Sequence, residues 1–481
     1  MKYFILIFTI LFSTLWGQEI EKILVWSDEF DYNGLPDKTK WNFETEGNAW
    51  GWGNGEDQFY TDSRLENAIV TNGVLKIIAL KETMKDKYYT SARINTKGKG
   101  EWRYGRFEAR MKLPSGRGIW PAFWMMPAEN FYGGWPNSGE IDIMEMFGWH
   151  NPDTTYFTIH TEAYNHKINT HKQGYYRDST IHSKFHIYAV EWFDDRLDFY
   201  FDDKKVFTYK KETDNYSVWP FDKPFYIILN NAVGGDWCRQ NGGIGDTKFP
   251  QVLEVDYVRV YKFKNNKKLK IDIIETTNGK VQIDKKEVNS GEKVKLIPIP
   301  EKGYKFAIWT GDIVSKKSEF EINVFEDLTI KPKFIPENEM LFNGDFSSGF
   351  IDWNFWVDNS VAKAMFRIID EKMNINIEKT GKYDWQIQLS TPVELKKDKK
   401  YVLKFKARSN VSKFPLRAGF NQNHSPWKSY YSKTFELERD FKEYSLEFKM
   451  NEETDFNSRV EFDLGSKMGG VIIDDVSLTF Q

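Results

Sequence analysis

Three acidic residues lie close together in the chain: Glu140, Asp142 and Glu145. Two neighbouring carboxyl groups can hydrolyse a glycosidic bond, because one attacks the anomeric carbon while the other protonates the departing oxygen. Hydrolysis that retains the anomeric configuration needs these groups about 5 to 5.5 Å apart. The spacing therefore makes this segment a candidate catalytic site.

Spacing alone is weak support, since 70 of the 481 residues are acidic. Three acids at these offsets are expected by chance roughly 1.5 times in such a chain. The neighbouring sequence is more specific: residues 119–127 read IWPAFWMMP and residues 135–139 read WPNSG. Exposed aromatic rings of this kind bind the apolar faces of sugars. The alternative interpretation is a solvated acidic strand face.

The acidic segment has the pattern of a β-strand with one irregularity. Side chains two residues apart share a face, so Glu140 and Asp142 point together while Ile141 and Ile143 point into the core. Glu145 has the opposite parity. One extra residue in the strand, a β-bulge near Met144, would return Glu145 to the shared face, and bulges are common beside active sites. We therefore predict a bulge there.

The surrounding elements are predicted to be strands. Residues 106–113 alternate polar and apolar side chains, which is typical of a half-buried strand. Aspartate pairs at 194–195 and 202–203 mark turns, and no long helical period occurs before residue 264. The first domain is therefore expected to be a β-sandwich or barrel.

The length of the chain and its composition breaks predict several domains. Residues 1–17 have a basic start, a short apolar run and a small residue at the end, which is typical of a secretory signal peptide. Residues 20–264 form the first domain, and Lys- and Asn-rich residues 262–270 are predicted to be a linker. Residues 268–336 form a small β module, and residues 338–481 form a second β-sandwich.

The first domain closely resembles glycoside hydrolase family 16, in its laminarinase-like branch with the E-x-D-x-x-E motif. Besides the acidic segment, the matching motifs are WSDEF at 26–30, YTSAR at 89–93, LNNAVGG at 229–235 and EVDYVRVY at 254–261. The resemblance implies a β-jelly-roll sandwich with a concave sheet that forms the substrate cleft. The predicted fold class is all-β, with this jelly roll, a small β spacer module and a C-terminal β-sandwich module.

The resemblance also implies the roles of individual residues. Glu140 is expected to be the nucleophile and Glu145 the acid/base, while Asp142 hydrogen-bonds Glu140 and the three titrate as a coupled set. Some of the tryptophans would instead be plain core residues. The expected substrate-binding residues are Asn54, Arg93, Trp120, Trp124, Trp135, His160, Asn230 and Trp237.

No cofactor is expected for catalysis. The family often carries a structural Ca²⁺, and Glu29, Asp256 and the carbonyl of Gly73 match its position, with the hard oxygen ligands that calcium prefers. Two segments depart from the common family pattern: GEDQ at 55–58 and the loop at 161–166. Because of these departures, the resemblance does not define the preference among related glucans.

The two accessory modules have resemblances of their own. Residues 303–309 read GYKFAIW, similar to small bacterial repeat modules, and their aromatics are expected to form a mini-core in a spacer. Residues 341–346 (LFNGDF) and 473–478 (IDDVSL) resemble carbohydrate-binding modules of families 4 and 9. The expected contacts of that module with sugar are Trp385, Gln388 and Trp427.

Composition limits the possible partners. The formal net charge of −3 gives no basic field, which argues against nucleic acid or an anionic membrane surface. Aromatic residues make up 17% of the chain with 18 Trp, which favours a neutral polysaccharide partner. Cys238 is the only cysteine, so no intramolecular disulfide forms. A secreted monomer, extracellular or periplasmic, is expected.

The predicted function is a retaining endo-glycosidase that hydrolyses β-1,3-glucan of the laminarin type, with activity on mixed β-1,3/1,4-glucan as an extension. The same fold serves agarases and carrageenases, so the linkage depends on the motifs. A non-hydrolytic glucan-binding protein is the alternative from another class, although such proteins typically lack the catalytic acids. A cell-surface adhesin would need an anchor that we do not find in the sequence.

Overall fold

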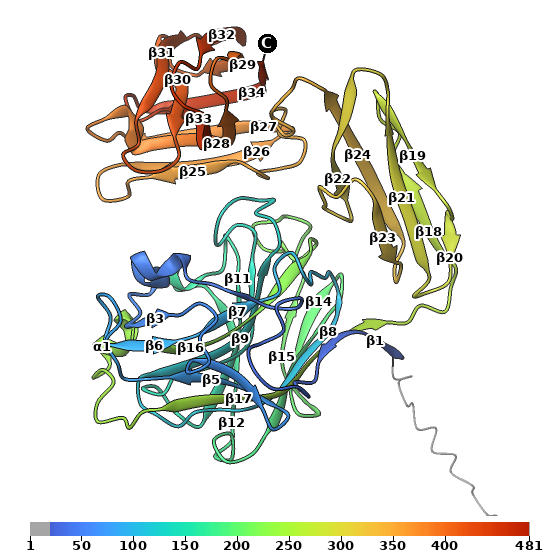
Figure 1. Ribbon diagram of the computed structural model, residues 1–481, viewed down its shortest axis with the longest axis vertical. Helices are drawn as coiled ribbons and strands as arrows, with labels where there is room; N and C mark the ends of the chain where they lie inside the picture. The colour runs from blue at the N-terminus through green and yellow to red at the C-terminus, as the bar shows by residue number, and fades with distance from the viewer. Residues whose placement is uncertain (1–19, 481) are drawn as a thin grey trace, which may run out of the picture.

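The computed structural model describes residues 20–480, which form three consecutive β-rich units (Figure 1). The signal peptide predicted at residues 1–17 lies outside the described residues. Among the described helices, none is both long and apolar enough to cross a membrane. The all-β prediction is confirmed.

Two facing sheets build the N-terminal domain. The larger has the strand order β15-β14-β13-β8-β17-β5-β4, and β1 also pairs with β17. Its strands are β1 (Lys22–Asp28), β4 (Ala68–Thr71), β5 (Val74–Ala79), β8 (Gly105–Lys112), β13 (His186–Trp192), β14 (Arg196–Phe201), β15 (Lys204–Lys210) and β17 (Gln251–Phe263).

The second sheet of this domain has the order β12-β11-β10-β9-β16-β7-β2 and carries the acidic segment on β10, next to its central strand. Its strands are β2 (Asn42–Phe43), β7 (Arg93–Asn95), β9 (Ile119–Pro127), β10 (Glu140–Met146), β11 (Thr154–His160), β12 (Lys172–Arg177) and β16 (Phe225–Val233). The remaining elements are β3 (Gln58–Tyr60), β6 (Tyr89–Ser91), and the short helices η1 (Glu46–Gly53), η2 (His166–Ile168) and α1 (Asp236–Gln240).

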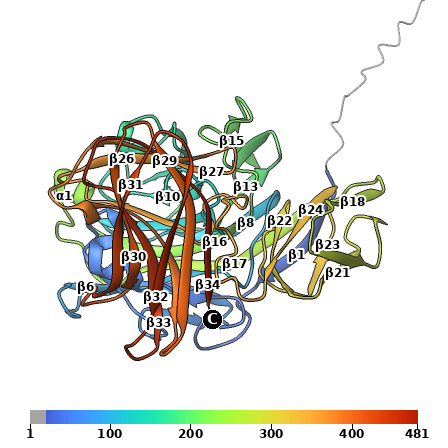
Figure 2. The same cartoon turned by 90° about the horizontal axis from the view of Figure 1, so that it is seen from above.

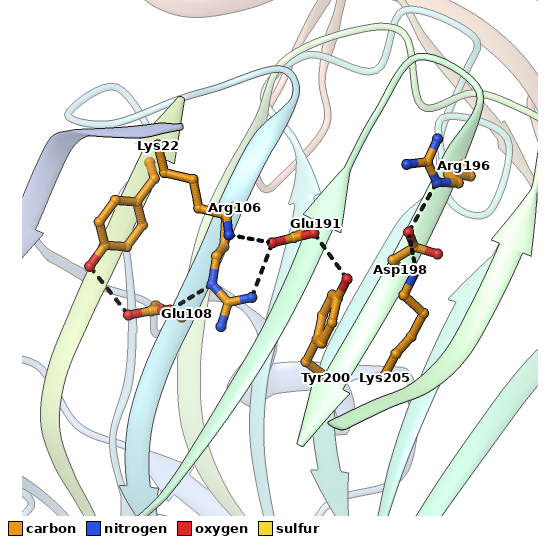
Figure 3. Close-up of polar contacts among 9 residues, drawn as sticks. Lys22, Arg106, Glu108, Glu191, Arg196, Asp198, Tyr200 and Lys205 are labelled. Atoms are coloured by element: carbon orange, nitrogen blue, oxygen red, sulfur yellow. Dashed lines mark hydrogen bonds and ion pairs between the residues drawn. The ribbon is translucent and has the colours of Figure 1, made fainter. Parts of the chain in front are cut away.

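The predicted alternation at residues 106–113 is confirmed in β8. Phe107 and Met111 are fully buried in the core between the sheets. On the outer face of the larger sheet, acids and bases pair with one another (Figure 3). Arg106 Nη1 lies 3.3 Å from Glu191 Oε1, and Asp198 Oδ2 lies 3.0 Å from Arg196 Nε. This outer face is therefore electrostatically balanced.

The middle module packs two small sheets around one core. The strands are β18 (Leu269–Ile273), β19 (Gly279–Ile283), β20 (Glu287–Val288), β21 (Lys293–Pro300), β22 (Tyr304–Gly311), β23 (Phe320–Asn323) and β24 (Leu328–Pro336). Trp309 is fully buried, and its ring centroid lies 4.9 Å from that of Phe306. The predicted aromatic mini-core is confirmed for these two residues.

The C-terminal module is a sandwich of two five-stranded sheets, with orders β25-β28-β33-β30-β31 and β26-β27-β34-β29-β32. Its elements are β25 (Asn354–Val357), β26 (Lys363–Ile369), β27 (Lys372–Lys379), η3 (Asp384–Gln386), β28 (Ile387–Leu395), β29 (Lys400–Ser409), β30 (Phe414–Gln422), β31 (Ser429–Leu437), β32 (Lys442–Lys449), β33 (Asp455–Asp463) and β34 (Gly469–Phe480). Its core is separate from that of the N-terminal domain.

The three units are packed together. In Figure 1 the C-terminal sandwich lies above the N-terminal domain and the middle module runs beside both; the view from above in Figure 2 agrees. Arg103 of the N-terminal domain forms ion pairs with Asp312 at 2.6 Å and Glu326 at 3.2 Å in the middle module. Lys316 of the middle module lies 2.6 Å from Asp352 of the C-terminal module.

Candidate active site

The three acids lie on β10 where the strand is irregular. Pairing with β11 matches Asp142 to Thr158 and Glu145 to Tyr156, so three steps on β10 face two on β11. Pairing with β9 skips a residue between Asp142 and Met144. These shifts are the predicted β-bulge, which is confirmed. Because of it, Glu145 shares the cleft face with Glu140 and Asp142, while Met144 is fully buried.

His160 and Trp120 lie against the three carboxyl groups. His160 Nε2 lies 3.4 Å from Asp142 Oδ2 and 3.7 Å from Glu140 Oε1. Trp120 Nε1 donates to Glu145 Oε1 at 2.9 Å. Within residues 20–480, His160 is the only basic side chain that pairs with any of the three acids. The acids thus lie together without the compensating cations seen on the outer sheet.

Burial and mutual repulsion hold protons on this group. Burial, followed by the charge of Asp142, raises the pKa of Glu140 to about 8. Burial also raises the pKa of Glu145 to about 7, against the lowering effects of His160 and the Trp120 hydrogen bond. The pKa of Asp142 rises well above its ordinary value, again mainly through burial. Three ionised carboxylates cannot coexist here, so the site retains at least one acidic proton at neutral pH.

The carboxyl groups open into a cleft of about 540 Å³. Trp124 lies in its floor and donates from Nε1 to Asn230 Oδ1 at 2.7 Å. Arg93 pairs with Glu44 and stacks over the Trp124 ring, with its guanidinium carbon 4.7 Å from the ring centroid. These contacts keep the aromatic floor rigid, and the mixture of rings and polar groups suits a polyhydroxylated ligand.

The structure brings together most of the expected substrate-binding residues. Six of the eight line the cleft: Asn54, Arg93, Trp120, Trp124, Trp135 and Asn230. His160 lies against the carboxylates and contacts Trp135, with 5.9 Å between ring centroids. Trp237 is not among the residues that line the cleft; it packs on Phe147, with 4.7 Å between ring centroids, and Phe147 in turn packs on Trp120.

Several cleft residues were not predicted from the sequence. Trp50 and Trp52 enter from η1, a Gly-rich segment in which Trp52 has the unusual φ of 58°. His166 and Lys167 enter from η2 and enclose Trp135, with 5.1 Å between the His166 and Trp135 ring centroids. The run of aromatic and glycine residues at 47–53 was the available signal, because such a segment suits an exposed sugar-binding loop. The other unpredicted lining residues include Glu44, Glu46 and Glu56.

The expected calcium ligands are engaged by arginines. Both Glu29 carboxylate oxygens accept from Arg259, at 3.0 and 2.8 Å. Asp256 Oδ2 accepts from Arg110 Nη1 at 2.7 Å. Gly73 lies in the turn between β4 and β5, with φ of 73°. Because guanidinium groups already neutralise both carboxylates, the residues as placed do not fit a calcium ion unless these pairs break. Calcium at this position stays a prediction.

The C-terminal module has a row of exposed aromatic rings beside η3. The Trp385 ring is nearly parallel to those of Trp356, at 16° and 6.2 Å, and Tyr383, at 10° and 5.6 Å. Gln388 Nε2 donates to Asp463 Oδ1 at 2.9 Å on the same sheet. Trp427 is 58% exposed and lies beneath Arg459. Trp356 and Tyr383 were not predicted from the sequence.

The known families that match this chain follow the order of its three structural units. The family described as Glycosyl hydrolases family 16 matches residues 55–259. A Divergent InlB B-repeat domain matches residues 269–334, and a Carbohydrate binding domain matches residues 338–469.

Individual relatives cover the N-terminal half of the chain. A beta-glucanase of Rhodothermus marinus is 50% identical over 247 residues, which are 50% of this chain and 85% of that protein. A glucan endo-1,3-beta-glucosidase of Cryptopygus antarcticus is 40% identical over 232 residues, 45% of this chain and 82% of that protein. The solved laminarinase of Rhodothermus marinus has 48% identity and a TM-score of 0.49, covering 51% of this chain and 99% of that one.

Proposed function

The chain belongs to glycosyl hydrolase family 16, and from this premise we propose that its N-terminal domain cuts β-1,3-glucan of the laminarin type within the chain. The relatives at 50% and 40% identity, a beta-glucanase and a glucan endo-1,3-beta-glucosidase, support this substrate. Cleavage of mixed β-1,3/1,4-glucan is proposed as a second activity of the same site.

One observation carries the proposal. The bulge in β10 places Glu145 on the same face as Glu140 and Asp142, in a cleft with an aromatic floor. A strand without the bulge would direct Glu145 into the core. The irregularity therefore favours a role for Glu145 in chemistry over a role in packing.

The proposed first step forms a covalent glycosyl-enzyme. A carboxylate oxygen of Glu140 attacks the anomeric carbon, the glycosidic C–O bond breaks, and Glu145 gives its proton to the departing oxygen. Trp120 holds Glu145 through its 2.9 Å hydrogen bond. Asp142, whose pKa rises well above its ordinary value mainly through burial, holds the proton of the pair in this proposal, so that Glu140 is ionised for attack.

The proposed second step releases the sugar. Glu145, now ionised, takes a proton from water; the hydroxyl attacks the same carbon and the ester bond to Glu140 breaks. Two inversions at one carbon retain the β configuration. The pKa of about 7 suits Glu145 for both roles, since a group near the working pH can give and then take a proton.

The accessory module and the location of the enzyme belong to the same proposal. The exposed row at Trp385 supports binding of the polysaccharide by the C-terminal module, which matches a Carbohydrate binding domain. The sequence of residues 1–17 supports export. A polysaccharide too large to enter a cell would be met outside it.

Product analysis tests the proposed substrate. The purified chain is incubated with laminarin, lichenan, agarose and carrageenan, and products are followed by chromatography and NMR. We expect fastest release of oligosaccharides from laminarin, slower release from lichenan, and a β-anomer as the first product. An α-anomer would refute the two-step mechanism. Cleavage of agarose or carrageenan without cleavage of laminarin would refute β-1,3-glucan as the substrate.

A further inference from the structure

The C-terminal module contacts the N-terminal domain at two loops that flank the catalytic strand. One loop, residues 128–138, runs directly into Glu140 at the start of β10. The other, residues 161–165, follows His160 at the end of β11. The C-terminal sandwich contacts both loops, through β26 and through the segment before β25. In Figure 1 this sandwich lies directly above the N-terminal domain.

The first loop is held by backbone and aromatic contacts. Phe350 N donates to the carbonyl oxygen of Phe131 at 2.9 Å. Gly349 allows this approach, because a Cβ there would collide with that carbonyl oxygen. Gly133 lies against the Phe366 ring, which is stacked on Phe350 at 4.2 Å and 21°. The two segments therefore fit closely.

This contact is linked to the catalytic strand within a few residues. Ser138 Oγ accepts from Tyr132 N at 3.0 Å and donates to the Gly133 carbonyl oxygen at 2.7 Å. Ser138 is buried and stands two positions before Glu140. A shift of Gly133 would thus move the entry to β10 as well as Trp135, which lies between them.

The second loop is held by an ion pair. Arg367 Nη2 lies 2.7 Å from Glu162 Oε1, which joins the C-terminal module to the loop after β11. The Glu162 carbonyl oxygen accepts from Asn165 Nδ2 at 3.1 Å, and Asn165 begins the turn that carries His166 and Lys167. The ammonium of Lys167 lies 4.8 Å from the Trp135 ring centroid.

The two series of contacts meet at Trp135, which lines the cleft beside Glu140. We propose that the docked C-terminal module fixes this end of the cleft, and that Arg367 is a positioning residue that acts on Trp135 through Glu162. This inference rests on the proposed hydrolysis of β-1,3-glucan. The module then serves the reaction even on substrates too short to reach its own sugar-binding face.

The test uses the full chain and a soluble β-1,3-linked glucose tetrasaccharide, on which tethering to a polymer has no effect. Arg367→Glu should raise KM about two- to fivefold, the loss of binding expected when a partly exposed ion pair is removed. Because this contact acts on substrate binding alone, kcat should be nearly unchanged. The double variant Arg367→Glu/Glu162→Arg should restore KM. Arg439→Glu, on an exposed arginine of the same module, is the matched control and should leave KM unchanged.

Melting curves accompany the kinetics, and Arg367→Glu is expected to melt with the wild type. If it melts lower, Glu162→Gln gives the same test from the other side of the pair. Equal KM for Arg367→Glu and Arg439→Glu would overturn the positioning role, as would a rise that the double variant does not reverse. Absence of cleavage by the wild type would instead refute the proposed function, so the two failures are distinguishable.

Discussion

Two strands of this protein carry acids two residues apart on a sheet face: Glu140 and Asp142 on β10, and Glu461 and Asp463 on β33. The difference lies in their partners. On β33, Arg459 pairs with Glu461, and Arg417 lies 2.7 Å from Asp463. On β10, the carboxylates pair only with His160 among the described residues.

Asp142, Glu461 and Asp463 are buried and Glu140 is partly buried, and burial raises the pKa of Asp463 to about 7 and that of Glu140 to about 8. At β33, Arg417 opposes this shift and stabilises the carboxylate. At β10 the proton itself compensates for burial. The comparison shows that one sequence spacing can serve a structural polar network or a proton-transfer site, depending on whether a guanidinium group faces it.

The largest expected contrast is in turnover. Glu140→Gln and Glu145→Gln should each remove nearly all hydrolysis of laminarin, since acid/base assistance alone is worth about 10²- to 10⁴-fold. Glu461→Gln should keep turnover of short oligosaccharides. Initial rates from reducing-sugar release measure all three, with circular dichroism to confirm folding. Activity near that of the wild type in either β10 variant would refute the assigned site.

The two strands should differ in how much a Gln substitution changes stability. Because burial raises the folded pKa of Glu145 to about 7, ionising it penalises the folded state as the pH rises through that value. Glu145→Gln should therefore stabilise the N-terminal domain at pH 8 by up to roughly 3 kcal/mol and have little effect at pH 4. Burial raises the pKa of Glu461 as well, but Glu461→Gln also removes the partner of the half-buried Arg459, so any stabilisation of the C-terminal module at pH 8 should be smaller.

Denaturant unfolding at both pH values measures these changes in the free energy of unfolding. Glu452→Gln, which removes an exposed pair with Lys428, is the control and should change stability by less than about 0.5 kcal/mol. Destabilisation by Glu145→Gln at pH 8 would contradict the interpretation of β10 as an electrostatically unbalanced site.

The pH dependence of hydrolysis sharpens the contrast further. Above pH 7 Glu145 loses the proton that it must donate, so kcat/KM should fall about tenfold for each pH unit beyond its pKa. The Trp120 hydrogen bond lowers this pKa, so Trp120→Phe should move the alkaline limb to higher pH. A limb that stays in place, or moves to lower pH, would argue against Glu145 as the acid.

Sugar binding by the C-terminal module should show a smaller effect. In a Glu140→Gln background, Trp385→Ala removes the central ring of the exposed row and should weaken retention in laminarin gels about five- to tenfold, equivalent to about 1 kcal/mol of ring contact. Phe441→Ala, next to β32 of the opposite sheet, is the control. Equal migration of the two variants would place the binding face elsewhere.

Calcium should have the smallest effect. An ion at Glu29 and Asp256 must displace Arg259 and Arg110, so we expect millimolar affinity at most. Adding 5 mM Ca²⁺, roughly five times such a Kd, would stabilise the N-terminal domain by about 1 kcal/mol, or about 2–4 °C in Tm. Calorimetry with and without EDTA measures this shift. A shift above about 10 °C would mean that the arginine pairs give way to a tight site.

The sequence alone predicted the elements that depend on local periodicity. Alternation predicted β8, and the odd spacing of Glu145 predicted the bulge in β10, because side-chain parity along a strand follows from backbone geometry. The motif context identified the acids and six of the other residues that line the cleft. The modules were separable because each one has its own apolar pattern and core.

Tertiary structure decided what depends on segments distant in the chain. Trp50 and Trp52 reach the cleft through backbone angles of η1 that have no regular period. Arg417 faces β33, whereas no arginine within residues 20–480 pairs with the acids of β10. The sequence does not predict this difference, because it depends on how the strands pack in the sheets. The contact between Arg367 and Glu162 joins residues 205 positions apart. Local patterns determine which face a side chain takes; only the packed modules determine what lies opposite it.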